Sequence, residues 1–498
     1  MGKPTTSKMQ GEGPKLSRRE LLKLGAGGLG GMAVADAAPA GAAASGLPAP
    51  DAAIPGPRAT PRRPNFLILM GDGIQPGEMS AAGNSIIQTP NLDRIAHEGM
   101  RLQNTFVTNA LCAPSRGTVL TGLYSRRNGV IDNKSRSIGT GIPIFPELLR
   151  QQGYEVAFGG KSHVRGALRD YYWDYYIGYH MQQPFINAPI AEGIDGKVGR
   201  DQIIEGYSDD ILTSGMTGWL EGRREKPFCG CLWLKAPHEP FIPPRHLAML
   251  YDGVKIPKPD TFDEDLKGYP GKPRAFANCD NKIGTDSTGV CTLEALVKQH
   301  YAATVGFDEN VGRVLTVLEQ SGKLDDTVVM LTADHGYFLG EWHFMDKRLM
   351  HEPSIRVPLL VRYPSLVKAG SLDPRMALNL DLAPTVLDLA GVEIPAAMQG
   401  RSLRPLLEGN TSAPWRSDWF YAFYEYPGPN MVPKNRGVRT ERYKLIEYWE
   451  QDPRQYELYD LQNDPGERHN LYGEAQYAGL TQELMKRLYD WGRDMGEI

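Results

Sequence analysis

Short apolar runs alternate with longer amphipathic segments over most of the chain. The first run, Asn65-Phe66-Leu67-Ile68-Leu69-Met70, is followed directly by Gly-Asp-Gly. A continuous apolar run of this length predicts a strand that is buried on both faces. Similar runs predict further strands at residues 154–158, 228–234, 327–331 and 357–361. Helical periodicity predicts helices at residues 90–98, 145–152, 292–321 and 381–390.

The alternation of strands and helices predicts an α/β fold. We expect a large mixed, mostly parallel sheet that is sandwiched by helices and occupies residues 64–410. Beyond this range the chain becomes rich in Tyr, Trp and charge, which predicts a smaller C-terminal antiparallel α+β subdomain at residues 411–498. Its expected elements are strands at 419–424, 437–440, 443–448 and 457–460 and a helix at 478–493.

The first 63 residues are expected to lie outside this fold. Residues 17–23 read Ser-Arg-Arg-Glu-Leu-Leu-Lys and precede a Gly/Ala-rich stretch that ends near Ala42-Ala43-Ala44. This arrangement is typical of a twin-arginine export signal, although a disordered tail with two chance arginines is the alternative. We interpret residues 1–44 as the signal peptide and the proline-rich residues 45–63 as a linker. The twin-arginine translocase is then a partner, and the mature protein is periplasmic or secreted by a bacterium.

Composition and charge exclude several classes of protein. The chain has 55 Lys+Arg and 59 Asp+Glu, a net charge of −4, so it lacks the basic excess of a nucleic-acid binder. Without residues 1–44, which carry six basic and three acidic residues, the net charge is −7. No later apolar run reaches about 20 residues, which excludes an internal membrane span. The five cysteines are too few for a disulfide scaffold, although Cys279 and Cys291 flank one loop and are candidates for a single bond.

Side chains suited to catalysis follow several of the predicted strands. Because ligands of such sheets bind beyond the carboxyl ends of the strands, we expect these side chains to lie close together. The cations among them would form a basic pocket in an acidic protein, which indicates that the substrate carries a small anionic group. These cations are Arg116, Lys161, His163, His238 and Lys347.

Cys112 opens the most distinctive segment, Cys112-Ala113-Pro114-Ser115-Arg116-Gly117. Pro114 suits the first turn of a helix, so we expect a helix from about Cys112 to Leu123. The thiol then lies where free backbone amides favour negative charge. Taken alone, a cysteine at a helix start is most often a buried packing residue.

The segment Cys112–Arg116 resembles the maturation motif of the type I sulfatases, which belong to the alkaline phosphatase superfamily. The resemblance extends over most of residues 64–498. Residues 346–350, Asp-Lys-Arg-Leu-Met, and the C-terminal segment are similar to bacterial sulfatases related to N-acetylglucosamine-6-sulfatase. Other matching segments are Gln88–Ala96, Gly160–His163 (with Ser162 where the family has Trp), Ala236–His238, Ala333–Gly336, Ile355–Pro358 and Leu458–Asp460.

The resemblance implies an enzyme that hydrolyses sulfate esters, with sulfated carbohydrates as its expected substrates. A formylglycine-generating or sulfatase-maturating enzyme would oxidise Cys112 to formylglycine (3-oxoalanine), and the hydrate of this aldehyde would attack sulfur. The resemblance also implies the roles of the surrounding side chains. Asp334 would help to activate the attacking hydroxyl, and His238 with Lys347 would protonate the leaving oxygen. His163 would take a proton from the second hydroxyl, while Arg116 and Lys161 would hold the modified residue and the sulfate.

The resemblance further implies a metal site made of Asp72, Cys112, Asp334 and His335. Its oxygen donors favour Ca²⁺, with Mg²⁺ as the alternative, while the nitrogen of His335 leaves a softer metal open. The family usually has two consecutive acidic residues after its first strand, but here Gly73 follows Asp72. We therefore expect weaker metal binding unless Gln75, Glu78 or a water replaces the ligand. An acidic residue restored at position 73 is expected to strengthen binding if the geometry allows.

Two alternatives to a sulfatase stay open. Related enzymes that share the Cys-x-Pro-Ser-Arg motif hydrolyse phosphonates or phosphodiesters. The loss of an acidic residue at Gly73 suggests a non-catalytic glycan-binding relative, although the retained cations and Cys112 argue against it.

Overall fold

The computed structural model describes residues 63–164, 171–222, 225–264, 266, 272–279, 283 and 292–498. The expected signal peptide (1–44) and the expected linker (45–63), apart from Arg63, lie outside the described residues, as does Cys291. Among the helices placed by the structure, none is both long and apolar enough to cross a membrane.

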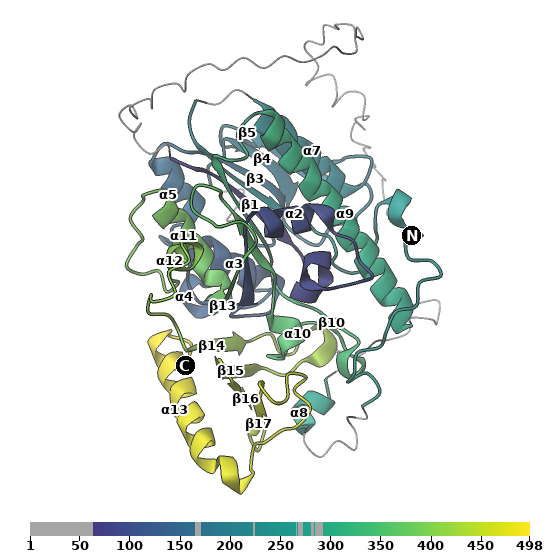
Figure 1. The fold of residues 1–498 in the computed structure, drawn as a ribbon, viewed down its shortest axis with the longest axis vertical. Coiled ribbons are helices and arrows are strands. Elements are labelled where there is room, and N and C mark those ends of the chain that lie inside the picture. The colour runs from purple at the N-terminus through teal and green to yellow at the C-terminus, as the bar shows by residue number, and fades with distance from the viewer. Residues whose placement is uncertain are drawn as a thin grey trace, which may run out of the picture.

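A large mixed sheet forms the centre of the molecule (Figure 1), and eleven strands of the described chain belong to it. Its five central strands run parallel, in the order β9-β1-β8-β3-β4. They are β9 (Thr327–Ala333), β1 (Asn65–Gly71), β8 (Phe228–Trp233), β3 (Glu155–Lys161) and β4 (Tyr175–Tyr179). The flanking strands are β13 (Ser371–Leu378), β2 (Met100–Phe106), β12 (Leu359–Arg362), β5 (Pro189–Ile194), β6 (Lys197–Val198) and β7 (Gln202–Ile203).

Helices cover both faces of this sheet, and the side chains of β1 show how. Leu67 and Leu69 pack in the cluster that contains α2 (Pro90–Glu98), α7 (Ser208–Glu221) and α9 (Leu293–Gln320). Phe66, Ile68 and Met70 point to the opposite face. That face is covered by α3 (Cys112–Thr121), α5 (Phe145–Gln151), α11 (Leu382–Leu389) and α12 (Arg404–Leu407). The α/β sandwich predicted from the sequence is confirmed.

A second, antiparallel sheet lies at the C-terminal end of the chain (Figure 1). Its strands are β14 (Asp418–Phe423), β15 (Asn435–Thr440), β16 (Tyr443–Tyr448) and β17 (Gln455–Asp460), and α13 (Ala478–Asp494) packs against it. Trp419 of β14 stacks on Phe106 of β2 with their ring centroids 5.2 Å apart. The two sheets therefore share one continuous apolar core. The remaining short elements include α4 (Ser125–Asn128), α8 (Arg274–Ala277), α10 (Glu352–Ile355), β10 (Phe338–Leu339) and β11 (Met345–Asp346).

The strands and helices expected from the apolar pattern are present, with ends shifted by a few residues at most. The pattern missed β2, β4, β5, β13 and α7. β2 reads Met-Arg-Leu-Gln-Asn-Thr-Phe and β13 contains Pro374, so neither has a continuous apolar run. β4 begins at the end of the aromatic segment 171–176, where Trp173, Tyr175 and Tyr176 are buried in the core. These three rings therefore serve packing in the core.

The C-terminal tail is anchored by a buried carboxylate. The side chain of Glu497 accepts hydrogen bonds from the backbone N–H of Arg126, at 3.0 Å, and from the Tyr424 hydroxyl. Arg126 lies in α4, directly after the loop that follows α3. Burial raises the pKa of Glu497 to about 7. Because the folded state favours the protonated form, this group stabilises the fold at low pH and the contribution is lost as the pH rises through 7.

Glu497→Gln is expected to flatten the dependence of stability on pH. An amide keeps an acceptor oxygen but cannot ionise, so the loss of stability between pH 4.5 and 7 should shrink by about 1–3 kcal/mol. Denaturant unfolding at several pH values measures this difference. The exposed Glu393→Gln serves as a control and should keep the wild-type slope. An unchanged slope in Glu497→Gln would contradict the assignment.

Candidate active site

Four adjacent parallel strands place the expected site residues at one edge of the sheet. Asp72 follows β1, Lys161 is the last residue of β3 and His163 lies two residues later. His238 lies in the loop after β8, and Asp334 and His335 directly follow β9. Cys112 is the first residue of α3, which ends at Thr121 where Gly122 turns left-handed, two residues before the expected end at Leu123.

Four of these residues form a compact buried cluster. The ligand atoms of Asp72, Cys112, Asp334 and His335 all lie within 4.8 Å of one another. The sulfur of Cys112 is 3.3 Å from His335 Nε2, and this nitrogen is 3.5 Å from one oxygen of each carboxylate. His335 Nδ1 is 2.8 Å from the carbonyl oxygen of Gly336. Since a carbonyl only accepts, Nδ1 carries a proton, so a neutral His335 ring presents its Nε2 lone pair to the cluster. Two carboxylates and an oriented imidazole suit a divalent cation.

The backbone angle at position 73 and the side chains around it both favour glycine. Its φ is +87°, a conformation that L side chains rarely adopt. A Cβ at this position would lie 3.2 Å from the ring of Tyr337 and 3.4 Å from His335 Cε1. Its N–H donates to Asp334 Oδ1 at 3.2 Å. A carboxylate at position 73 would therefore strain the backbone and crowd the imidazole instead of adding a ligand.

Gln75 and Glu78, the expected replacements for the missing ligand, point elsewhere. The Glu78 carboxylate is 2.6 Å from His300 Nε2 and accepts the N–H of Gln75 at 2.8 Å. The Gln75 amide donates to the carbonyl oxygen of Tyr337. In this structure both side chains therefore hold the loop after β1 and are not directed at the cluster.

Arg116 and Lys161 pair with the carboxylates of the cluster. Arg116 Nε donates to Asp334 Oδ2 at 2.8 Å, and its Nη2 donates to Asp72 Oδ2 at 3.1 Å. The Lys161 ammonium also donates to Asp72, and its backbone carbonyl accepts from Arg116 Nη1 at 2.5 Å. All four side chains are fully buried. Burial and Cys112 act to raise the pKa of Asp72, but Lys161, His238 and Arg116 hold it well below its usual range.

The surroundings of Cys112 favour its anionic form. Burial opposes ionisation, yet Lys161, Lys347 and His335 hold the pKa of the thiol well below its usual value. His163 lies beside it with a backbone φ of +52°, and burial together with Lys161 lowers the pKa of His163 to about 4. Its ring is therefore neutral near pH 7 and can accept a proton.

His238 and Lys347 lie against each other, and Lys347 interacts electrostatically with Cys112. Lys347 Nζ is 3.4 Å from His238 Nε2, 3.1 Å from Asp346 Oδ1 and 3.7 Å from Glu239 Oε1. Burial opposes the charge of Lys347, but Glu239 and Cys112 raise its pKa above the usual value. The ammonium therefore stays charged and faces the reactive centre.

Some functional neighbours were missed by the sequence reasoning. The amide of Gln182 lies 2.8 Å from His238 Nε2, and no motif marks it because it follows the unpredicted β4.

Two further residues support the site from neighbouring elements. Asp209 of α7 is buried and accepts the backbone N–H groups of Lys235 and Ala236, at 3.2 and 2.8 Å, so it holds the loop that carries His238. Tyr421 of β14 accepts from Ala110 N at 3.3 Å and donates to Arg348 O at 2.7 Å. These two hydrogen bonds link the segment before Cys112 to the segment after Lys347.

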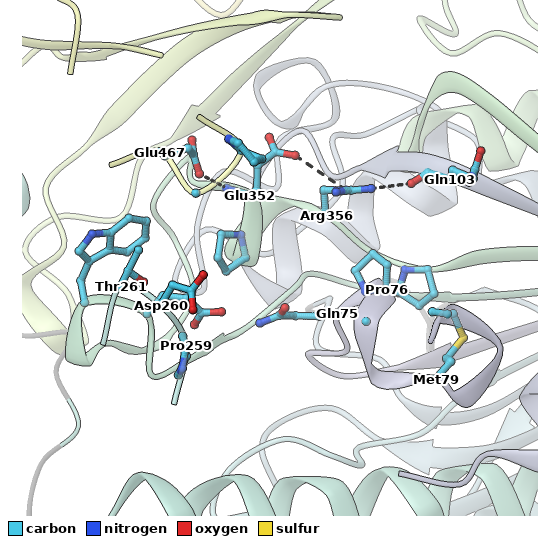
Figure 2. Close-up of a pocket in the computed structure, with 18 of the residues that line it drawn as sticks. Gln75, Pro76, Met79, Gln103, Pro259, Asp260, Thr261, Glu352, Arg356 and Glu467 are labelled. Atoms are coloured by element: carbon cyan, nitrogen blue, oxygen red, sulfur yellow. Dashed lines mark hydrogen bonds and ion pairs between the residues drawn. The ribbon is translucent and has the colours of Figure 1, made fainter. Parts of the chain in front are cut away.

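A cavity of about 540 Å³ is lined by a different set of residues (Figure 2). Figure 2 shows Arg356 between Glu352 and Gln103, with Arg356 Nη2 donating to the carbonyl oxygen of Gln103 at 2.7 Å. The cavity is lined by the loop after β1, by β2, by α10 and by residues 465–467. None of the nine residues expected in the site from the sequence lines it.

Two protein-family models and a sulfatase from Bacteroides match most of this chain. The family model described as Sulfatase matches residues 64–392, and the model described as N-sulphoglucosamine sulphohydrolase, C-terminal, matches residues 340–494. The chain is 37% identical to the N-acetylglucosamine-6-O-sulfatase of Bacteroides thetaiotaomicron over 490 residues, which cover 86% of both chains.

Solved structures are similar over nearly the whole described fold. A protein in complex with its substrate D-glucosamine-2-N,6-O-disulfate is 33% identical with a TM-score of 0.80, covering 88% of this chain and 99% of that one. The phosphonate monoester hydrolase of Agrobacterium radiobacter is 22% identical with a TM-score of 0.72, covering 87% of this chain and 96% of that one. The second match shows a shared fold alone.

Gly73→Asp is expected to lower the stability of the fold and to weaken metal binding, instead of supplying a further metal ligand. The left-handed backbone should cost about 1–2 kcal/mol of stability, and the crowded His335 should bind metal less well. Denaturant unfolding of metal-free protein and calorimetric Ca²⁺ titration measure the two effects.

Gly77→Ala is the matched control, because a Cβ there meets nothing within 4 Å, and it should behave like wild type. Asp72→Ala should abolish Ca²⁺ binding. Tighter Ca²⁺ binding by Gly73→Asp at unchanged stability would overturn this account of the glycine.

Proposed function

The chain belongs to the sulfatase family, and on that premise we propose that it is a formylglycine-dependent, metal-assisted sulfatase that acts on sulfated carbohydrates. Hydrolysis of sulfuric esters follows from the family and from its relatives. The observation that carries the finer proposal is the position of Cys112, whose sulfur lies within the cluster of Asp72, Asp334 and His335 and whose pKa is lowered by Lys347, the partner of His238.

Cys112 is the proposed nucleophile after oxidation to formylglycine by a formylglycine-generating or sulfatase-maturating enzyme. The hydrated aldehyde has two hydroxyls on one carbon. One hydroxyl oxygen would attack sulfur as its proton passes to Asp334, the bond from sulfur to the leaving oxygen would break with the electron pair on that oxygen, and His238 with Lys347 would protonate it. His163 then takes the proton from the second hydroxyl, the carbon–oxygen bond to the sulfate breaks and the aldehyde is restored.

Charge on the sulfuryl oxygens is offset by groups that are fixed before the reaction. Lys347 is charged and oriented by Glu239 and Asp346, and Lys161 lies beside Cys112. We assign Arg116 to hold Asp72 and Asp334 in place, and through them the modified residue. Asp334 is the carboxylate that we expect to assist the attacking hydroxyl.

Asp72, Asp334, His335 and the modified Cys112 would hold a divalent metal, Ca²⁺ in our proposal and Mg²⁺ as the alternative. When bound, such an ion supplies positive charge that lowers the pKa of a hydroxyl and stabilises negative charge on oxygen. The donor set fits this ion, because two buried carboxylates have their cationic partners on one side and the oriented nitrogen of His335 on the other.

A sulfated glucosamine is the proposed substrate. The relative from Bacteroides is named for N-acetylglucosamine-6-O-sulfate chemistry, and the structurally similar protein was solved with a sulfated glucosamine. We further propose that residues 64–410 form the catalytic domain, that residues 411–498 form its subdomain, and that residues 1–44 direct the protein to a periplasmic or extracellular location by the twin-arginine translocase.

A parallel assay distinguishes sulfate ester hydrolysis from the rival reaction, hydrolysis of phosphonates or phosphodiesters. We expect release of sulfate from 6-O-sulfated glucosamine to exceed turnover of a phosphodiester and of a phosphonate ester at equal concentration. A protein that hydrolyses the phosphorus esters faster would be assigned to the rival class. Binding of the sulfated sugar without release of sulfate by metal-loaded, oxidised protein would support the glycan-binding alternative.

Oxidation of Cys112 is tested directly by peptide mass spectrometry. Active protein should contain the aldehyde or its hydrate at position 112 in place of the thiol, and Cys112→Ala should lower turnover at least about 1,000-fold, because the covalent intermediate cannot form. Cys231→Ala, which removes another buried cysteine, should keep the activity. A fully active preparation that carries only the unmodified thiol would refute the proposal.

A further inference from the structure

Gln182 occupies the solvent side of the proposed proton donor. Its side-chain nitrogen lies 2.8 Å from His238 Nε2, although Gln182 itself is exposed and His238 is buried. The segment that carries Gln182 is fixed on both sides. Upstream, His180 Nδ1 is 3.4 Å from Ser162 Oγ, and downstream the carbonyl oxygen of Gln183 accepts from Lys235 Nζ at 2.5 Å. The contact between the amide and the imidazole is thus built into the loop after β4.

The hydrogen bonds of His238 define its tautomer. Nδ1 lies 2.7 Å from the backbone carbonyl oxygen of Glu239, which can only accept, so Nδ1 carries a proton. Nε2 faces Gln182 and also Lys347 Nζ, at 3.4 Å. An ammonium can only donate. When the ring is neutral, Nε2 accepts from these donors, but when the ring is protonated its Nε2–H cannot be satisfied by Lys347.

A carboxamide resolves this conflict because it carries a donor and an acceptor on one group. Rotation by about 180° exchanges the amide nitrogen of Gln182 for its oxygen at nearly the same place. We propose that Gln182 is a positioning residue that satisfies His238 Nε2 in both protonation states of the free enzyme and yields this place to the leaving-group oxygen when substrate binds. The proposal rests on the proposed function for the identity of the proton acceptor.

The proton balance of the step follows from this exchange. When the bond between sulfur and the leaving oxygen breaks, the electron pair stays on that oxygen, which takes the proton of His238 Nε2. The neutral ring then accepts the N–H of Gln182 until solvent returns a proton. Gln182 does not touch the reacting atoms during transfer, and its effect passes through His238.

Other charged groups also face the imidazole. Glu239 Oε2 lies 3.3 Å from Nδ1, Lys347 lies against Nε2, and Asp72 and His238 interact electrostatically. These groups are identical in wild type and in variants at position 182. A comparison of such variants therefore isolates the contribution of the amide.

Two substitutions with opposite consequences test the proposal. Gln182→Glu offers acceptors only and favours the protonated ring, so the alkaline limb of the kcat/KM profile against pH should move up by about one pH unit. Gln182→Leu offers neither donor nor acceptor, so the same limb should move down, with kcat/KM for a sulfated sugar reduced about 10-fold at pH 7. Gln183→Glu and Gln183→Leu are matched controls one residue away and should keep the wild-type profile.

The nature of the leaving group gives a second readout. An aryl sulfate whose phenol is acidic needs little protonation, so both variants at position 182 should hydrolyse it at nearly the wild-type rate. Equal losses with the aryl and the sugar sulfate, at an unshifted pH profile, would indicate a merely structural role for Gln182 and overturn the proposal.

An experiment that needs no turnover separates this inference from the proposed function. In protein with Cys112→Ala and labelled histidine, the His238 signal is identified among ten histidines by its loss in His238→Gln. Its NMR titration should shift to higher pH in Gln182→Glu and to lower pH in Gln182→Leu. Shifts in the same direction, or none, would refute the role of Gln182. Opposite shifts in a chain that hydrolyses no sulfate ester would retain that role and refute the proposed function.

Discussion

The pairing of two buried carboxylates with two buried cations is the interaction on which the site depends. Asp72 and Asp334 end two neighbouring central strands, where like charges would repel at close range in a poorly screened interior. Arg116 bridges them with separate nitrogens, and Lys161 adds a further charge to Asp72. Removal of one member would leave an uncompensated buried charge, so these side chains hold the ends of β1, β3 and β9 and the start of α3 at fixed separations.

This pairing also divides the cations of the site into two groups. Arg116 and Lys161 pair with Asp334 and Asp72, whereas Lys347 and His238 lie against each other and are held by Glu239. Lys161 of the first group and Lys347 of the second, together with His335, lower the pKa of the Cys112 thiol although it is buried. The C-terminal sheet contributes to this arrangement through Tyr421, whose hydroxyl links the segment before Cys112 to the segment after Lys347.

Much of this arrangement could be predicted from the sequence because it depends on local patterns. Continuous apolar runs identify β1, β3, β8 and β9, and a parallel sheet brings the residues after them to one edge. The features that could not be predicted depend on contacts between residues far apart in the sequence. The exposed Gln182 belongs to a loop after a strand whose aromatic residues concealed it. The need for glycine at position 73 arises from a backbone angle and from two rings that lie more than 250 residues further along the chain.

The burial of Cys112 bears on when the residue could be modified relative to folding of the chain. Cys112 is 1% exposed at the first turn of α3, with its sulfur among residues that follow β1 and β9, so a modifying enzyme would not reach it in the finished fold. If Cys112 is modified as proposed, the modifying enzyme would need access to it on the nascent or newly released chain, before these strands assemble. Once the strands have closed, a molecule that missed the modification is fixed in that state for as long as it stays folded, and the cell would then hold two populations with the same fold and different chemistry.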